Sequence, residues 1–224
     1  EPPRPAQQVE NPTPAETLKF LRHTPSYLYN LAGTAALTFA SGGLAYWFPT
    51  FLSRMRGWQI TSATQFFGAI TVLAGVTGTL FGGFIADSWQ TKNRRAYFYV
   101  SALGMLVAAP LAVGAIVIQN RAWVFPLVFL AEFFLFFNMS PLNAAIISVV
   151  QSKMRATAMA LNILFIHVLG DAVSTWVIGK VSDTTGSLTL GVLVGPIAIL
   201  AGGLILLAGA KSLERDQIRL EVER

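Results

Sequence analysis

Two ionisable side chains, His167 and Asp171, lie near the middle of an apolar stretch that runs from Ala156 to Gly179. A spacing of four residues places both on one face of a helix, where the imidazole and the carboxylate can hydrogen-bond to each other. An imidazole group also titrates near neutral pH, so the pair has the chemistry of a proton-binding site. The stretch is long enough to cross a bilayer, and charged groups at that depth need a protein partner or water. The pattern therefore predicts either a polar site that faces a cavity or a pair that holds helices together.

A second apolar stretch, residues 122–150, contains the carboxyl group of Glu132. At 100° per residue, Glu132 shares a helix face with three later residues, Phe136, Met139 and Asn143. We expect this face to contact protein or water, and either a structural hydrogen bond or a role in substrate or proton binding would explain Glu132. Asn138 points elsewhere and could serve a helix contact. Pro126 and Pro141 interrupt the stretch, which predicts a kink near residues 137–143.

The first apolar stretch, residues 27–51, carries small and hydroxyl-bearing residues at helical spacing: Thr34, Thr38, Ser41 and Ala45. Such a stripe lets membrane helices pack closely, and the alternative is that it lines a water-filled cavity. Tyr46 and Trp47 follow it and either bind a ligand or anchor the helix at the membrane interface. The candidate substrate-cavity residues are therefore Glu132, Asn138, Asn143, His167, Asp171, Tyr46 and Ser41.

A loop of mixed charge follows the apolar stretch 63–86. Asp87 ends this stretch, Gly83 lies four residues before it, and three basic residues come after it, Lys92, Arg94 and Arg95. A carboxylate at a helix end can hold the start of the next helix through charge-assisted hydrogen bonds. The pattern predicts a conformational latch, and charge anchoring at the membrane surface is the alternative.

The composition indicates an integral membrane protein, because 54% of the 224 residues are hydrophobic, 12% are charged and the mean hydropathy is +0.57. The chain has no cysteine and two distant histidines, so we expect no disulfide, no metal site and no cofactor. The common catalytic motifs are missing, and we expect no enzyme activity. A hydrolase built on His167, Asp171 and Ser174 is a weak alternative, because neighbours on one helix do not converge on a reacting atom. The net charge of +5 reflects basic loops, and we expect no nucleic-acid partner.

Six apolar stretches, each long enough to cross a bilayer, predict an all-α membrane protein with a six-transmembrane-helix bundle: 27–51, 63–86, 96–118, 122–150, 155–179 and 188–210. An even number of spans puts both termini on one side. Twelve of the sixteen lysines and arginines lie on that side, which predicts that both termini are cytoplasmic. The expected organisation is a cytoplasmic linker and amphipathic lead-in at 1–24, the transmembrane bundle at 25–210, and a cytoplasmic tail at 211–224.

Two parts of the sequence resemble known transporters. Gly83-x-x-x-Asp87, with the basic residues that follow, resembles the cytoplasmic loop motif of the major facilitator superfamily, although Ser88 and Gln90 replace the usual basic residue and glycine. The residues of 155–183 resemble the eleventh helix of Spinster-type lipid transporters, through Arg155-Ala-Thr-Ala158, His167-Val-Leu-Gly-Asp171-Ala-Val-Ser174 and Ile178-Gly179-x-Val-Ser182-Asp183. Asn138 and Lys153-x-Arg155 fit the preceding helix of that family.

The resemblance implies the C-terminal six-helix half of a 12-helix major facilitator superfamily fold. It implies a secondary active transporter that moves lysophospholipids or sphingosine-1-phosphate-like molecules by alternating access, coupled to protons. The expected partners are the N-terminal six-helix half of the same transporter, an amphipathic or lipid substrate and membrane lipid, in the plasma (inner) membrane if the protein is bacterial. The alternative is a self-contained six-helix membrane protein, such as a homodimeric carrier, an accessory subunit or an intramembrane hydrolase.

Overall fold

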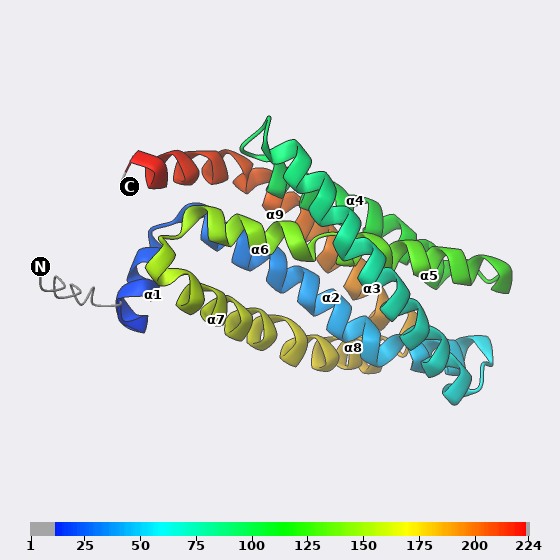
Figure 1. Cartoon of the computed structure of the whole chain (residues 1–224). Helices are drawn as coiled ribbons and strands as arrows, with labels where there is room; N and C mark the ends of the chain where they lie inside the picture. Colours follow the sequence, from blue (N-terminus) through cyan, green and yellow to red (C-terminus); the bar gives the residue numbers. More distant parts are fainter. Residues whose placement is uncertain (1–11, 223–224) are drawn as a thin grey trace, which may run out of the picture.

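Helices make up nearly all of residues 12–222, which are the residues that the computed structural model describes (Figure 1). Their bounds are α1 Pro14–Arg22, α2 Pro25–Arg56, α3 Ile60–Gln90, α4 Ala96–Val117, α5 Arg121–Phe136, α6 Met139–Val149, η1 Ser152–Met154, α7 Arg155–Ile166, η2 His167–Asp171, α8 Ala172–Thr185 and α9 Leu188–Val222. Residues 1–11 of the predicted linker and residues 223–224 of the predicted tail lie outside the described residues.

Five helical segments of the described chain are long and apolar enough to cross a membrane: Ile60–Gln90, Ala96–Val117, Arg121–Val149, Ser152–Thr185 and Leu188–Val222. They correspond to five of the six predicted spans. The remaining span lies in α2, which has a comparable length of 32 residues but a lower hydropathy because of its polar residues, among them Asn30, Thr34 and Thr38. The predicted all-α membrane bundle is confirmed, with α2 as its most polar long helix.

Local sequence signals set several of the helix ends. Thr13 and Glu16 form a capping box in front of α1, in which the Thr13 N–H donates to the Glu16 carboxylate at 2.8 Å and the Glu16 N–H donates to the Thr13 hydroxyl at 3.3 Å. Pro25 occupies the first turn of α2, where its missing N–H costs nothing. Gly57 and Gly186 end α2 and α8 with φ near +67° and +66°, a conformation that favours glycine.

Helix α2 runs through the centre of the bundle, with α9 along one side and the α7–η2–α8 segment along another (Figure 1). Helix α4 packs on α5 and α9, and α3 packs on α5. Close approach depends on small residues. A Cβ at Gly202 of α9 would lie 3.2 Å from the carbonyl oxygen of Gly33 in α2, so the two backbones nearly touch.

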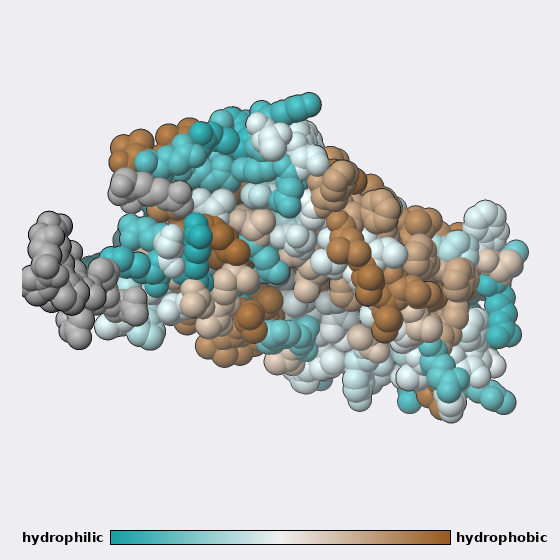
Figure 2. Space-filling model, in the orientation of Figure 1, coloured by the Kyte–Doolittle hydropathy of each residue, from teal (hydrophilic) through white to brown (hydrophobic). Residues whose placement is uncertain are grey.

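Helix α1 and the C-terminal part of α9 lie at one end of the bundle (Figure 1). Helix α9 continues past the predicted boundary at residue 211 to Val222, and Asp216 in this continuation is buried. The Asp216 carboxylate accepts hydrogen bonds from the N–H and the hydroxyl of Ser26, at 2.9 and 2.6 Å, and so caps the start of α2. Hydrophilic residues gather at this end, whereas the middle of the molecule shows a large hydrophobic surface (Figure 2).

Candidate functional site

The helix with the central ionisable pair changes from α to π geometry between His167 and Asp171. Such π-turns insert an extra residue and are frequent at functional sites. Gly170 presses this turn onto α2, since a Cβ there would lie 2.9 Å from the backbone nitrogen of Phe39. Two contacts from α2 bracket the turn: the Thr38 hydroxyl lies 3.2 Å from the Ile166 carbonyl oxygen, and the Trp47 indole N–H donates to the Thr175 carbonyl oxygen at 3.0 Å. The π-turn is therefore held firmly against α2.

Within the π-turn, His167 Nδ1 and Asp171 Oδ2 are in hydrogen-bond contact. The side chains are 58% and 37% exposed, so the pair lies on the surface of this bundle rather than in its interior. His167 and Asp171 lie about 18 Å and about 24 Å along the helix axis from Arg155. Both are therefore near the middle of the segment Ser152–Thr185. A charged pair at this depth is poorly solvated by hydrocarbon, so its exposed side must meet protein or water.

Two further predicted cavity residues, Ser41 and Tyr46, lie on the part of α2 that packs against η2 and α8. Gly42 lies between them, and a Cβ there would be 3.3 Å from the Asp171 Cα. The Ser41 hydroxyl donates within its own helix, to the Thr38 carbonyl at 3.3 Å. Tyr46 is 63% exposed and its ring contacts Trp47 edge-on. The structure therefore brings the stretch of α2 around Ser41 and Gly42 against Asp171, and the exposed Tyr46 lies one helical turn further along α2.

The predicted interruption near residues 137–143 is a true break, because α5 ends at Phe136 and α6 begins at Met139. Asn138 is completely buried at this break, and its amide donates to the carbonyl oxygens of Phe134 at 2.7 Å and Leu135 at 3.1 Å. This satisfies backbone groups that the break removes from the helical pattern. Asn138 faces Gly104 of α4 and is not part of the exposed surface around His167.

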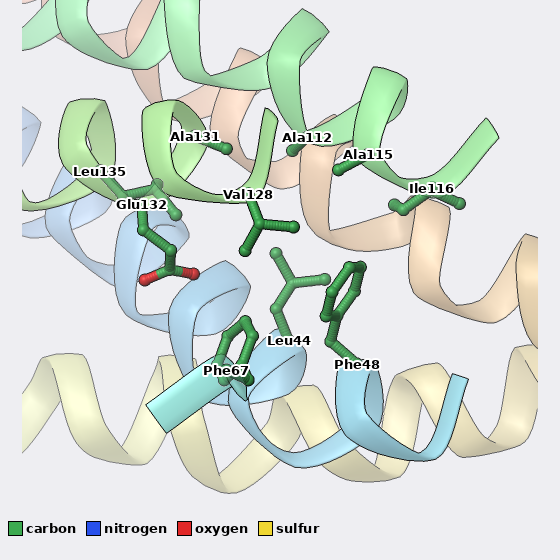
Figure 3. Close-up of a pocket in the computed structure, with 10 residues that line it drawn as sticks. All are labelled: Leu44, Phe48, Phe67, Ala112, Ala115, Ile116, Val128, Ala131, Glu132 and Leu135. Carbon is green, nitrogen blue, oxygen red and sulfur yellow. The ribbon is translucent and has the colours of Figure 1, made fainter. Parts of the chain in front are cut away.

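Glu132 lies in the interior of the bundle, where it is 5% exposed. Its carboxyl group points from α5 toward α2 and the ring of Phe67 (Figure 3). It borders a cavity of about 20 Å³, whose other walls are apolar: Leu44, Phe48, Phe67, Ala112, Ala115, Ile116, Val128, Ala131 and Leu135. No hydrogen bond or ion pair to this carboxyl is found among residues 12–222. The cavity has room for about one water molecule.

Glu132 and the π-turn are separated by α2. Leu44 and Phe48 of α2 border the Glu132 cavity, whereas Gly42 faces Asp171. Asn143 is exposed on α6, beyond the break, and does not line the Glu132 cavity. The prediction that Glu132 and Asn143 share one helix face is therefore wrong, because the 100° count assumes one continuous helix through residues 137–138, where α5 ends and α6 begins.

A surface groove of about 670 Å³ runs between α3 and the α5–α6 break. Its walls are mostly apolar: Thr71, Val72, Gly75, Val76, Thr79, Leu80, Phe136 and Met139. This groove was not predicted from the sequence. Small residues at positions 71, 75 and 79 were the available signal, since a spacing of four residues places them on one helix face.

The loop predicted to act as a latch makes two sets of contacts. The Asp87 carboxylate accepts a hydrogen bond from the Tyr97 hydroxyl, in the first turn of α4, at 3.1 Å. Arg94 pairs with Glu221 at 2.8 Å and Arg95 with Glu214, both on α9. The hydrogen bond to Glu221 raises the pKa of the Arg94 guanidinium further. Arg94 and Arg95 thus bind α9 rather than Asp87, and the latch itself stays a prediction.

The remaining two predicted latch residues differ in their surroundings. A Cβ at Gly83 would lie 2.7 Å from the Ser140 hydroxyl oxygen, so this glycine brings α3 close to α6. Lys92 is exposed in the loop after α3. Within residues 12–222, the Lys92 side chain makes no hydrogen bond or ion pair with Asp87.

Comparison with known proteins places this arrangement in a family. The family model of the Major Facilitator Superfamily matches residues 1–175, which is more than half of the chain. The chain belongs to the major facilitator superfamily. Protein spinster homolog 3 of Danio rerio is 31% identical over 242 residues, which cover 96% of this chain and 48% of the relative. The sphingosine-1-phosphate transporter SPNS2 of Xenopus tropicalis is 30% identical over 241 residues, which cover 96% of this chain and 47% of the relative.

The fold of this superfamily member is similar to that of a bacterial homolog of the human lysosomal transporter Spinster, in an inward-facing and unoccupied conformation. The TM-score is 0.70 at 17% identity, over 99% of this chain and 53% of the other. The chain thus spans about half the length of the curated relatives it matches. The predicted resemblance to Spinster-type transporters and the prediction of a half-length superfamily fold are confirmed.

Three features of this superfamily member were not predicted. The π-turn was missed because α and π turns share the same side-chain types, and the choice depends on packing against α2. The contacts of Thr38 and Trp47 with backbone carbonyls depend on the distance between two helices. The pairing of the loop arginines with Glu214 and Glu221 had a weak signal, namely two acids seven residues apart on one face of the tail helix.

Proposed function

We propose that this chain forms the C-terminal six-helix half of a secondary active transporter that moves lysophospholipid- or sphingosine-1-phosphate-like molecules by alternating access, coupled to protons. The observation that carries the proposal is the His167–Asp171 pair, which lies at mid-span and is exposed on the surface of this bundle. The SPNS2 relatives from Xenopus tropicalis and Mus musculus are named sphingosine-1-phosphate transporters, which supports the substrate class.

The surface around the pair needs a second wall. In the most apolar part of Ser152–Thr185, 22% of the residues are buried, compared with 56% in Ala96–Val117. A helix that combines the least burial with an ionisable pair is suited to face water and a second bundle rather than lipid. Secondary transporters place their substrate sites near the midplane between two such repeats, which rock against each other. The N-terminal half of the same transporter would supply the opposite wall.

The polar and apolar surfaces of this half suit an amphipathic substrate. An ammonium group would pair with the Asp171 carboxylate, and a phosphate group would accept a charge-assisted hydrogen bond from a protonated His167. The groove between α3 and the α5–α6 break offers about 670 Å³ of mostly apolar surface for an alkyl chain. Tyr46, with 63% of its surface exposed, offers an aromatic ring on α2.

Two titratable sites in this half support the proposed proton coupling. The His167–Asp171 contact can hold a proton between an imidazole and a carboxylate, on a surface that water reaches when the two halves separate. Glu132 lies in an apolar cavity without a hydrogen-bonding side chain from the described chain. An unpaired negative charge in such a site is strongly unfavourable, so this carboxyl needs a proton, a water molecule or a cationic ligand.

Movement of the two halves requires places where the helices change shape. The α5–α6 break and the π-turn interrupt two of the long helices near their middles, which is where discontinuous transporter helices are expected to bend. We further propose that both termini are cytoplasmic and that Asp87, Gly83 and the basic residues of the following loop form a latch on that side. The concentration of basic residues at the terminal end supports this orientation.

The test is flux of a lysophospholipid into liposomes that contain the full-length transporter. We expect Asp171→Asn to lower the flux at least tenfold while the variant still elutes as a folded, monodisperse protein. Asp183→Asn is the matched control, because this carboxylate is exposed on the same helical segment, and its flux should equal that of the unmodified protein. We expect an imposed pH gradient to drive uptake, and Glu132→Gln to reduce that response.

Three outcomes would contradict parts of the proposal. Flux that is indifferent to an imposed pH gradient would rule out proton coupling. Loss of folded Asp171→Asn protein in proportion to the loss of flux would show that the pair is structural. Full flux in Asp171→Asn would remove the π-turn from the transport site.

A further inference from the structure

The short helix α1 presents a basic face at the end of the bundle where the termini lie. Its inner side is packed against α2 and α7, and Thr17 and Leu21 on that side are completely buried. Lys19 and Arg22, three residues apart, are exposed on the outer side. Because residues at this spacing are neighbours on a helix, the two cationic groups lie together.

A surface hollow of about 360 Å³ lies beside these two residues. Ala15, Leu18, Lys19, Arg22 and His23 line it, so it combines a small apolar wall with three nitrogen-bearing side chains. The His23 ring is positioned by its Nδ1–H, which donates to the Lys19 carbonyl oxygen at 2.7 Å. Among residues 12–222, no acidic residue lines the hollow. Its chemistry is that of a site for an anion attached to an apolar body.

Three arginines at the same end of the molecule as the hollow already have partners. Arg94 and Arg95 pair with acidic residues, and Arg219 donates to the Thr24 hydroxyl at 3.2 Å. Lys19 Nζ and the Arg22 guanidinium have no hydrogen-bond or ion-pair partner among residues 12–222. Two neighbouring cations without a partner repel each other, and a shared anion would remove that repulsion.

We propose that the α1 hollow binds the headgroup of an anionic phospholipid, with the phosphate between Lys19 and Arg22. Helix α1 precedes α2 directly and lies at the hydrophilic end of the molecule, next to the hydrophobic surface that the membrane covers (Figure 2). The phosphates of membrane phospholipids lie at this boundary between the hydrophilic end and the hydrophobic surface, and Arg and Lys bind them through charge-assisted hydrogen bonds. Ala15 and Leu18 contact the apolar part of the lipid below the headgroup. The bound lipid is a structural ligand rather than the transported substrate, so this proposal does not depend on the proposed function.

The experiment measures binding of a short-chain phosphatidylglycerol to the purified full-length protein in a neutral detergent. Each basic residue near a membrane surface contributes about 1 kcal/mol, so the Lys19→Gln/Arg22→Gln double variant should bind roughly 30-fold more weakly. The matched control is Lys211→Gln/Arg215→Gln, which removes the same charge from exposed positions on α9, outside the hollow. The control should bind as tightly as the unmodified protein, and Lys19→Arg/Arg22→Lys should retain most of the affinity.

Several results would overturn this assignment. The first is an affinity of the Lys19→Gln/Arg22→Gln variant that equals that of the unmodified protein. The second is a loss of affinity in the control variant as large as that in the Lys19→Gln/Arg22→Gln variant. The third is binding of a short-chain phosphatidylcholine as tight as that of the phosphatidylglycerol. Glycerol phosphate without acyl chains tests the source of the phosphate: weak binding supports a lipid, and binding as tight as that of the phospholipid overturns it. The elution profile and thermal midpoint of each variant are measured beside the affinity, and a Lys19→Arg/Arg22→Lys variant that is folded but does not bind also contradicts the proposal.

Discussion

Replacing Gly82 by alanine tests whether the close contact between α3 and the α5–α6 break holds this half together. A Cβ at Gly82 would lie 2.7 Å from the carbonyl carbon and 2.9 Å from the Cα of Phe137, and these are backbone atoms that a rotamer change cannot move. Overpacking a tight contact costs about 1–3 kcal/mol, and the upper end applies where the backbone itself must shift. The higher helix propensity of alanine stabilises the helix by about 1 kcal/mol relative to glycine. The net expectation is a loss of about 2 kcal/mol.

The matched control is Gly68→Ala in the same helix, because a Cβ there meets nothing within 4 Å. For this control we expect the helix propensity term alone, a gain of about 1 kcal/mol. The assay is the thermal midpoint of the full-length protein in detergent. Because this chain spans about half of its relatives and the shift falls as chain length rises, 1 kcal/mol should move that midpoint by roughly 1–2 °C. Gly82→Ala should lower the midpoint by roughly 2–4 °C, and Gly68→Ala should leave it unchanged or raise it. Equal midpoints for the two variants would refute the argument that α3 and the break are in direct backbone contact.

Two further predictions concern the helix starts near the termini. Asp216→Ala leaves the N–H and hydroxyl of Ser26 without their acceptor in a buried place, so we expect a loss of about 2 kcal/mol in thermal unfolding, which Asp183→Ala should not reproduce. Hydrogen bonds from the backbone and side chain of Thr13 hold the pKa of Glu16 below its usual range. Because the folded pKa is the lower one, the contribution of Glu16 to α1 is present above about pH 4.3 and is lost as the pH falls through the folded value. Amide hydrogen exchange in the first turn of α1, corrected for intrinsic rates, should therefore accelerate in acid, and a Thr13→Ala variant that keeps the same acid dependence would contradict the capping box.

The helical bundle could be predicted from the sequence because its signals are local. Apolar stretches of sufficient length predict membrane spans wherever the rest of the chain lies, and Pro141 indicates a break because its ring and its missing N–H disturb the same helix that contains it. Asn138 was recognised as a polar residue at the break. That its amide donates to the freed carbonyl groups of Phe134 and Leu135 could be seen only in the folded structure.

The candidate site could be predicted only in part. The contact between His167 and Asp171 follows from residues four apart on a helix, and the structure contains it. The position of Glu132 relative to this pair does not follow from spacing, because the break before α6 changes the direction of the face and α2 lies between the two groups. The partners of Arg94 and Arg95 lie more than a hundred residues away in α9, and no local pattern specifies such a distance.

The sequence by itself determined the membrane class of this protein, its long helices and the presence of two ionisable groups at mid-span, since each depends on hydropathy and on neighbours within one helix. The tertiary structure alone decided that the π-turn presses on α2 and that Glu132 lies in an apolar cavity. These features depend on how helices far apart in the chain approach one another. That approach is set by close contacts such as Gly170 against Phe39, which exist only in the packed bundle.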